Sequence, residues 1–479
     1  MDSSSAHSKH PQRPTPTDFD EFLPWACQQL SVETTVVVIR SLLKQYVSVI
    51  AERPKKEKKT KSRATSMASS SEDAISVVRE ATKSSINSEI PITIEAFYDS
   101  NGNLIQLQFM NNKPIPREVF KIIGLVVPYH KLLRSITINS GLAMESIYEI
   151  SKFINISHIT EMVLDGTVLL EANYHILLDH SCLKYLSLSK CKINDTVVQT
   201  ISSKIVYPNP ASHKLSALNL ATNRITDIGA KYLADALRTN RKLGYLNLAD
   251  NMITDDGAIS ILNTLKSFVL TKQEVLDSKG RLLQYLKKKN GLIGAIAKEL
   301  LKSDQDKKAV KKKVAKPLHT MLMRKNKQLE KELSKECHVV SSFEKPCGEL
   351  RERAASLAEC QIGFFSDPFS AEKIYTTGKT TFCYGNNGLC YLNLAYNDLT
   401  YATLKVLYEV VVTQRNMQRV PRGLINVVIE GNFMPIECEE LQKIDEILSL
   451  ALYYSLPRQS TVVKKRHSHS NIKTADKLN

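Results

Sequence analysis

Four consecutive residues, Thr377-Gly378-Lys379-Thr380, have the types that hold a nucleotide phosphate in a glycine-rich loop. Such a loop also needs a glycine five residues before Gly378, so that backbone N–H groups can surround the phosphate oxygens. That position is Lys373, and neither a buried apolar strand before the motif nor a helix after it is evident. The sequence therefore favours a solvated loop at this place over a nucleotide site.

A structural zinc site is the second candidate chemistry, and its ligands would be Cys337, His338, Cys347 and Cys360. Structural zinc ligands are usually paired two to four residues apart, and these spacings are irregular. The nine cysteines include no C-x-x-C pair, and Cys191 falls inside an apolar repeat, where a buried apolar role is expected. No G-x-S-x-G or H-E-x-x-H motif occurs. We therefore predict a protein without a catalytic centre, metal or cofactor.

The most informative pattern is a repeat. The motif L-x-x-L-x-L-x-x-N occupies Leu215–Asn223 and returns 28 residues later at Leu243–Asn251. Leucines at this spacing place apolar side chains beneath a short strand, and a buried Asn can satisfy the backbone of the neighbouring coil. A helix pattern follows each Asn, as at Ala230, Leu233 and Leu237. A fixed period of this kind predicts stacked strand-plus-helix units.

Six further copies bring the expected number of units to eight, and they begin at Leu104, Leu133, Ile159, Leu183, Leu389 and Leu424. In the copy from Leu183, Cys191 stands where Asn is expected. The predicted fold class is therefore an α/β solenoid with parallel strands inside and helices outside; the units resemble leucine-rich repeats, and this resemblance implies a horseshoe. Alternation at Ile92, Ile94 and Ala96, followed by Asn101-Gly102, predicts a hairpin that caps the first repeat.

The rest of the chain is expected to surround this solenoid. Within the insertion, we expect one helical stretch interrupted at Asn290-Gly291, a second helix from Leu318 to Glu336, and an irregular loop over 338–382. We expect the insertion to be dispensable for folding. The predicted order is a helical segment (1–52), a disordered basic linker (53–88), the cap hairpin with six repeats (89–268), a basic insertion (269–380), two repeats with a cap helix (381–456) and a disordered basic tail (457–479).

The net charge of +16 is concentrated in three segments. Residues 281–336 carry +11, residues 51–65 carry +5 and residues 458–479 carry +5, so the remainder of the chain is mildly acidic at −5. Runs such as Lys311-Lys312-Lys313 could be nuclear import signals, contacts to an acidic polymer or simply solvated. No run of 18 apolar residues exists, and residues 1–17 lack the apolar region of a secretion signal. We expect no membrane span and a cytoplasmic protein.

The concave face of the sheet would be lined by positions three, five and seven of each unit, 24 positions in all, and none is Lys or Arg. A groove that follows phosphates needs cations, so nucleic acid is an unlikely partner there. Tyrosines beside amides suit a protein surface, although these side chains could merely solvate the sheet. The predicted partner-binding residues are Tyr185, Asn219, Tyr245, Asn247, Tyr391 and Asn393.

These units make the chain resemble leucine-rich-repeat proteins of the ribonuclease-inhibitor-like class. From Leu215 to Asn432 it is similar to the family of leucine-rich repeat-containing protein seventy-one, through the paired units, the segment Phe268–Thr271 before a Lys-rich insertion, and the return at Leu389. This resemblance implies a non-enzymatic component of motile cilia or flagella. We therefore expect an interaction scaffold whose basic segments bind an acidic partner such as tubulin or an axonemal protein.

Relatives of the same repeat class include GTPase-activating proteins, which makes Arg224 a candidate arginine finger. That position recurs in every repeat as an exposed turn residue, and a basic tail replaces the acidic tract of those activators. The alternative function is a regulatory module of a GTPase or another nucleotide-binding enzyme.

Overall fold

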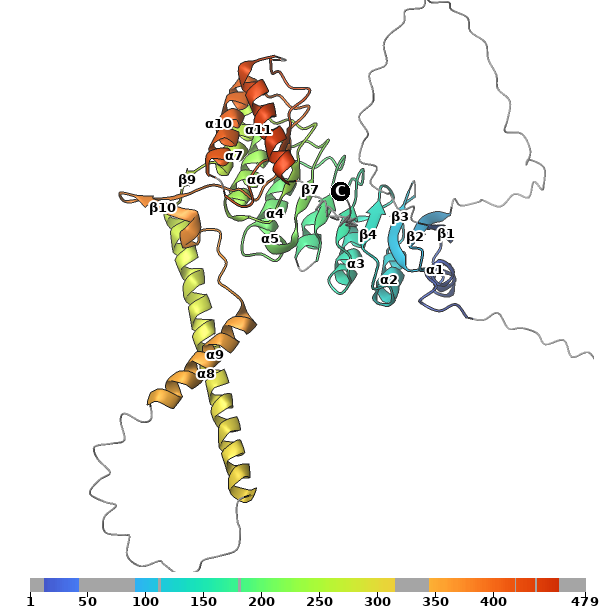
Figure 1. Cartoon of the computed structure of the whole chain (residues 1–479). Helices are drawn as coiled ribbons and strands as arrows, with labels where there is room; N and C mark the ends of the chain where they lie inside the picture. Colours follow the sequence, from blue (N-terminus) through green and yellow to red (C-terminus); the bar gives the residue numbers. More distant parts are fainter. Residues whose placement is uncertain are drawn as a thin grey trace, which may run out of the picture. The chain divides into compact units, whose positions relative to one another are not determined.

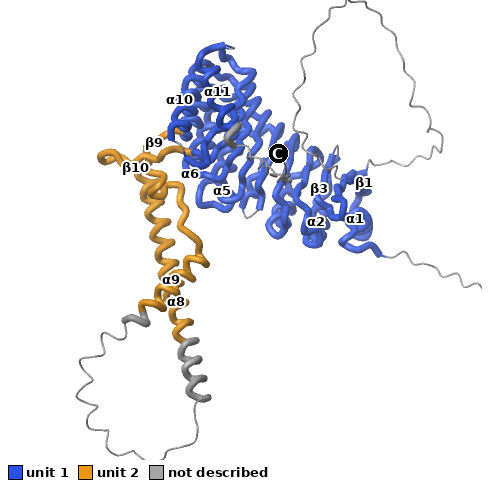
Figure 2. Tube along the Cα trace, in the orientation of Figure 1, with its two compact units in different colours: residues 1–265, 387–479 blue, residues 266–386 orange. Residues whose placement is uncertain are grey.

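The computed structural model describes residues 13–42, 91–110, 113–179, 182–314, 344–417, 419–435 and 437–455. Two compact units make up the chain: unit 1 contains residues 1–265 and 387–479, and unit 2 contains residues 266–386 (Figure 2). The linker expected at 53–88, the helix expected at 318–336 and the tail expected at 457–479 lie outside the described residues.

Unit 1 is built on one ten-stranded sheet (Figure 1). Its strands follow the chain in the order β1-β2-β3-β4-β5-β6-β7-β8-β12-β13, and every neighbouring pair is parallel except the β2–β3 hairpin. The strands are β1 (Val36–Leu42), β2 (Ile92–Tyr98), β3 (Leu104–Phe109), β4 (Ser135–Ile138), β5 (Glu161–Val163), β6 (Tyr185–Ser187), β7 (Ala217–Asn219), β8 (Tyr245–Asn247), β12 (Tyr391–Asn393) and β13 (Asn426–Val428).

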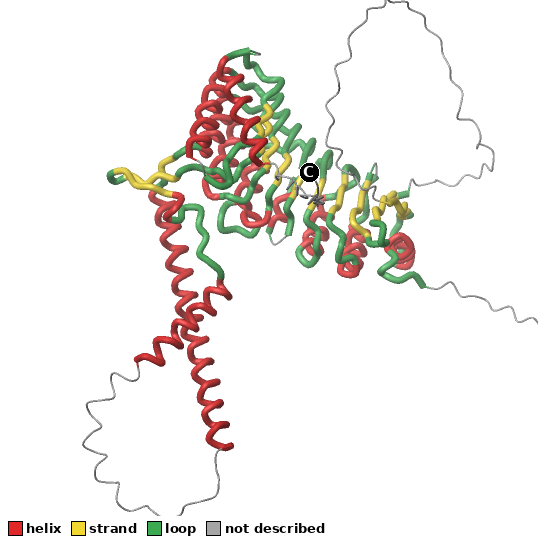
Figure 3. The backbone as a smooth tube through the Cα atoms, in the orientation of Figure 1, coloured by secondary structure: helices red, strands yellow, loops and turns green. Residues whose placement is uncertain are grey.

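Helices cover one face of this sheet (Figure 3). In β7, β8 and β12 the central leucine is fully buried beneath them (Leu218, Leu246 and Leu392), whereas its two neighbours are half-buried. The predicted α/β solenoid with parallel strands is therefore present. The helical elements are α1 (Phe19–Gln29), α2 (Arg117–Val126), η1 (Val127–Tyr129), α3 (Met144–Ile154), η2 (Tyr174–Leu178), α4 (Asp195–Ile205), α5 (Ala211–Lys214), α6 (Asp227–Thr239), α7 (Asp255–Leu265), α10 (Tyr401–Met417) and α11 (Glu439–Ser455).

The N-terminal segment corrects one expectation. Residues 36–42 form strand β1 instead of the helix predicted there, and β1 pairs in parallel with β2. Val36, Val37, Val38 and Ile39 are consecutive β-branched residues, which lose side-chain freedom in a helix and favour an extended strand. Among the described residues of this segment, 13–42, only α1 is helical, and it buries Phe19 and Leu23.

The predicted hairpin is confirmed in β2 and β3, which are antiparallel. The Asp99 carboxylate holds its turn by accepting hydrogen bonds from the backbone N–H groups of Asn101 (2.9 Å) and Asn103 (2.8 Å). Gly102 has φ of +79° in this turn, a conformation that glycine adopts without strain. β3 is itself the strand of the first repeat, so the hairpin is not a separate cap before that repeat as expected, and β1 occupies the outer position in this sheet.

Unit 2 contains the long helix α8 (Lys272–Val314), α9 (Glu344–Ile362), η3 (Ala371–Lys373) and an antiparallel sheet. Its strands β9 (Phe268–Val269), β10 (Ile374–Thr377) and β11 (Thr380–Cys383) are arranged in the order β10-β11-β9. Two expectations are wrong here. Helix α8 passes through Asn290-Gly291 without a break, and the region expected to be irregular contains α9 and a hairpin. One interior glycine costs only about 1 kcal/mol relative to alanine, which the surrounding helix formers offset.

The glycine-rich motif closes this hairpin. Thr377 pairs with Thr380, and Gly378, with φ of +63°, lies in the two-residue turn between β10 and β11. No helix follows the motif, because Thr380 begins a strand. The geometry is a hairpin turn instead of the solvated loop that the sequence favours, and it lacks the loop-to-helix order of a phosphate-binding loop.

Candidate functional site

The strand register of unit 1 brings the predicted partner-binding residues into two rows on the face opposite the helices, which we call the open face. Tyr185, Ala217, Tyr245 and Tyr391 are aligned on adjacent strands in one row. Ser187, Asn219, Asn247 and Asn393 are aligned in the next row. The pairing of β8 with β12 is needed for both rows, although all of unit 2 separates these strands in sequence.

Two of the tyrosines form an aromatic stack. The Tyr245 and Tyr391 ring centroids are 5.5 Å apart, with an interplanar angle of 29°. The Asn426 Nδ2 donates a 2.7 Å hydrogen bond to the Tyr391 hydroxyl, which fixes the end of the stack. Tyr185 is separated from Tyr245 by the register position of Ala217 and therefore belongs to the same row without joining the stack. The result is a rigid, half-buried aromatic surface with hydroxyl groups.

The asparagine row is held by the backbone. The Oδ1 atoms of Asn219, Asn247 and Asn393 accept hydrogen bonds from the N–H groups of the alanines two residues later, at 3.1, 3.0 and 2.9 Å. The Asn219 Nδ2 also donates to the Ser187 Oγ at 2.9 Å, so this side chain has a structural role. Among the described residues, the Asn393 Nδ2 has no acceptor. Because the Asn247 side chain hydrogen-bonds Tyr245, Asn393 is the amide of this row that is most available to a partner.

The open face carries few charged side chains and is neutral to mildly acidic. Burial raises the pKa of Tyr245, the neighbouring Tyr185 adds to this rise and the Asn247 amide opposes it. The phenol is therefore protonated at neutral pH and can donate a hydrogen bond. The acidic members of the predicted columns are Glu161, Asp165 and Glu430, and the Asp165 carboxylate accepts from the Ser187 Oγ at 2.6 Å. Without a cation in these columns, the surface is unsuited to a phosphate backbone.

Behind the open face, the repeat asparagines link successive units. Asn223 Oδ1 accepts from the backbone N–H groups of Cys191 (3.1 Å) and Ile193 (3.0 Å), while its Nδ2 donates to the carbonyls of Leu188 and Leu220, both at 2.9 Å. Related bonds are made by Asn251, Asn397 and Asn432. Asn112 of the first copy lies outside the described residues.

Cys191 takes the asparagine position in its own unit. Its Sγ donates to the Leu164 carbonyl at 3.2 Å, and burial raises the pKa of its thiol. Because a protonated, buried thiol is a poor nucleophile, Cys191 has a structural role and not a chemical one.

A second set of links, formed by aspartates, was missed in the sequence. Asp195 at the start of α4 accepts hydrogen bonds from the N–H groups of Thr226 (2.9 Å) and Gly229 (3.0 Å), which begin the next helix. Asp227 does the same for Thr254 and Gly257, and Asp255 does so for Thr400 and Thr403. The recurring pattern T-D-x-G, at 226–229 and 254–257, is the signal that could have revealed them. A carboxylate at a helix N-terminus is favoured by the helix dipole and by the free N–H groups.

The described residues do not form the other candidate sites, the arginine finger and the metal site. Arg224 lies exposed in its turn, where its N–H donates to the Ile193 carbonyl at 2.8 Å. Within the described residues, no three His, Cys, Asp or Glu side chains are grouped to hold a metal ion, and Cys337 and His338 lie outside those residues. No helix in the described part of the chain is long and apolar enough to cross a membrane.

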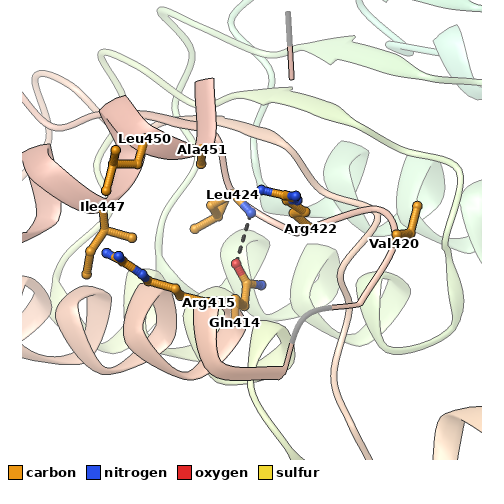
Figure 4. Close-up of a pocket in the computed structure, with 8 residues that line it drawn as sticks. All are labelled: Gln414, Arg415, Val420, Arg422, Leu424, Ile447, Leu450 and Ala451. Atoms are coloured by element: carbon orange, nitrogen blue, oxygen red, sulfur yellow. Dashed lines mark hydrogen bonds between the residues drawn. The ribbon is translucent and has the colours of Figure 1, made fainter. Parts of the chain in front are cut away.

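A cavity of about 450 Å³ lies between α10 and α11 (Figure 4). Beside it, the Gln414 Oε1 accepts from the Leu424 N–H at 2.9 Å and its Nε2 donates to the Leu265 carbonyl at 3.2 Å. None of the predicted site residues lines this cavity. Its lining residues are Gln414, Arg415, Val420, Arg422, Leu424, Ile447, Leu450 and Ala451.

Comparison with known proteins agrees with the repeated strands. Residues 179–202, 211–234 and 239–262 match the family model described as leucine rich repeat. No curated protein matches the chain, and nothing in these comparisons supports the narrower resemblance to the family of leucine-rich repeat-containing protein seventy-one. Together with the parallel sheet and its covering helices, the matches support a leucine-rich-repeat protein, and its repeats indicate a module for protein–protein interaction.

Proposed function

We propose that this chain is a non-enzymatic scaffold that binds a protein partner on the open face of unit 1. The observation that carries the proposal is the stacked pair Tyr245 and Tyr391, which lies beside a row of amides in columns that contain no Lys or Arg. Rigid tyrosines supply contact area and hydrogen bonds at a low entropic cost, and they are enriched at the centres of protein interfaces. Tyr185, Asn219, Asn247 and Asn393 extend the same surface.

The basic segments provide a second contact in this proposal, to an acidic partner. Residues 281–336 carry +11, a charge that attracts acidic surfaces at low ionic strength. The resemblance to ciliary repeat proteins supports tubulin or an axonemal protein as the partner, with the chain placed in the cytoplasm and in the axoneme of motile cilia or flagella.

Affinity purification of the tagged full chain, followed by mass spectrometry, tests the open face. We expect a Tyr245→Ala/Tyr391→Ala variant to lose the captured partner and to keep its folding. Tyr148→Ala is the matched control, because Tyr148 lies on α3 and is 43% exposed. Axonemal proteins among the captured partners would support the proposed role in the axoneme. Equal capture by the parent and the double variant would contradict the open-face site.

Regulation of a GTPase is the alternative function, and the exposure of Arg224 favours it. An arginine finger inserted into a GTPase site raises its rate by several orders of magnitude. If the chain works in this way, an Arg224→Ala variant loses a measurable stimulation of GTP hydrolysis by the captured partner. Under the scaffold proposal, neither the parent nor this variant changes that rate.

A further inference from the structure

The N-terminal half of helix α8 carries an apolar stripe. Leu276, Leu283 and Leu286 are 61%, 54% and 43% exposed. A helix turns by about 100° per residue, so these three side chains fall within roughly 80° of one another. We call this set the leucine stripe. Helix α9 packs against later turns of α8, around Ile296, Ala354 and Ala358, and its Leu350 lines a pocket with Leu301 of α8.

Charged residues in the same half of α8 differ between its sides. Two cations that face the rest of unit 2 are paired: the Arg281 Nε contacts the buried Asp367 carboxylate at 2.6 Å, and the Lys289 Nζ contacts Glu359 at 2.5 Å. In helical projection Lys279 lies between Leu283 and Leu286, and Lys287 lies about 20° beyond Leu276; neither forms an ion pair among the described residues. The acidic residues of this half, Glu274 and Asp277, lie about 100° or more from Leu276.

Gly280 adds a third observation. It lies within about 40° of Leu276 on α8, and a Cβ built on it meets nothing within 4 Å. It costs about 1 kcal/mol of helix stability relative to alanine, and packing inside the chain does not require it. A small residue on an exposed helix face allows a second helix to approach closely.

We propose that the leucine stripe binds an acidic amphipathic helix of a partner protein. A narrow stripe fits the seam of a helix pair, in which apolar side chains interlock and flanking charges select the partner. Lys279 and Lys287 favour a helix with Glu or Asp beside its own apolar seam. A second copy of α8 would bring lysines against lysines. This inference rests on the proposed contact with an acidic partner and assigns residues to it.

The full chain can be tested with a labelled helical peptide of about four heptads, which has Leu at its seam and Glu beside it. A second peptide with Lys in place of Glu controls for charge. Fluorescence anisotropy should show binding of the Glu peptide, which weakens as salt rises from about 0.05 M to about 0.5 M. The Leu283→Ser/Leu286→Ser variant should lose at least about tenfold in affinity. Leu357→Ser, a change at a 44% exposed leucine of α9, should bind as the parent does.

Charge reversal gives an independent readout. Lys279→Glu/Lys287→Glu should weaken binding of the Glu peptide and strengthen binding of the Lys peptide. The Tyr245→Ala/Tyr391→Ala variant should bind the Glu peptide normally, which separates failure of the open face from failure of the stripe. The inference is overturned if the parent does not bind the Glu peptide or binds both peptides equally, or if the serine variant binds unchanged.

Other occupants of the stripe would give different results, and each would also overturn the inference. Sedimentation would detect a dimer that the Leu283→Ser/Leu286→Ser variant abolishes if a second copy covers the stripe. If a membrane surface covers the stripe, anionic vesicles would bind the chain through the same leucines, and the Glu peptide would not bind. If binding of the Glu peptide appears only after deletion of residues 318–336, that segment of the chain is the occupant.

Discussion

The Asp227 carboxylate accepts a 3.0 Å hydrogen bond from the backbone N–H of Gly257, one repeat further along the chain. A Cβ on Gly257 would stand 2.5 Å from Asp227 Oδ1 and 2.9 Å from the Asp227 Cα. The same relationship joins Asp195 to Gly229. Glycine is therefore required at these helix starts by the approach of the preceding repeat and not by its backbone angles.

Gly257→Ala should lower the stability of unit 1. Alanine favours a helix by about 1 kcal/mol, but overpacking against Asp227 costs typically about 1–3 kcal/mol and pushes the carboxylate from its donors. Urea unfolding followed by the fluorescence of Trp25, the single tryptophan, measures the effect in unit 1. Gly294→Ala is the control, because its Cβ would enter open space. Equal stability of Gly257→Ala and the parent would show that the Asp227 side chain can move without loss of stability.

Asn223→Leu should destabilise unit 1 more than a change at the neighbouring exposed position. Leucine cannot bond the N–H groups of Cys191 and Ile193 or the carbonyl of Leu188, and each stranded buried group costs about 1–3 kcal/mol. Thermal unfolding should shift clearly downward for Asn223→Leu and, for the same reason, for Asn251→Leu. Arg224→Leu should melt like the parent. Parent-like melting of both Asn variants would contradict the buried role of these amides.

Acid should weaken the junction between α7 and α10. Burial alone would raise the pKa of Asp255, but hydrogen bonds from Thr400 and Thr403 outweigh it and hold this pKa below its ordinary value of 3.8. A carboxyl with a depressed folded-state pKa contributes stability that is present above its unfolded pKa and is lost as pH falls through its folded pKa. The free energy of unfolding of the parent should therefore fall below about pH 4. Asp255→Asn should be less stable at neutral pH and should lose less on acidification; identical pH profiles would refute the link.

Unit 1 should fold without unit 2. Removing residues 267–386 leaves residues 266 and 387–390 between α7 and β12, a connection as long as residues 240–244 between α6 and β8. The β8–β12 pairing and the Asn397 Nδ2 bond to the Leu248 carbonyl (3.0 Å) can then form as in the full chain. Circular dichroism and Trp25 fluorescence should show a cooperative, soluble protein. Aggregation of this deletion and of a second variant with a Gly-Gly-Ser insert would show that unit 2 is needed for folding.

The sequence by itself determined the register of the repeats. Tyr245 aligns with Tyr391, and Asn247 with Asn393, as the leucine pattern predicts, because apolar alternation within a few residues decides which side chains face the helices. The role of the repeat asparagines followed from the same local pattern. The binding of a partner by the six open-face residues stays a prediction.

Only the tertiary structure decided the features that depend on distant partners. The apolar spacing of Val36–Leu42 is compatible with a helix and its β-branched residues with a strand, and pairing with Ile92–Tyr98 decides for the strand. Tyr245 and Tyr391 stack although all of unit 2 separates them in sequence. Asp195 contacts Gly229 only when two neighbouring repeats pack together. Local periodicity records which face of an element is apolar. It does not record which remote element covers that face, because that choice is made by packing and hydrogen bonds between segments far apart in the chain.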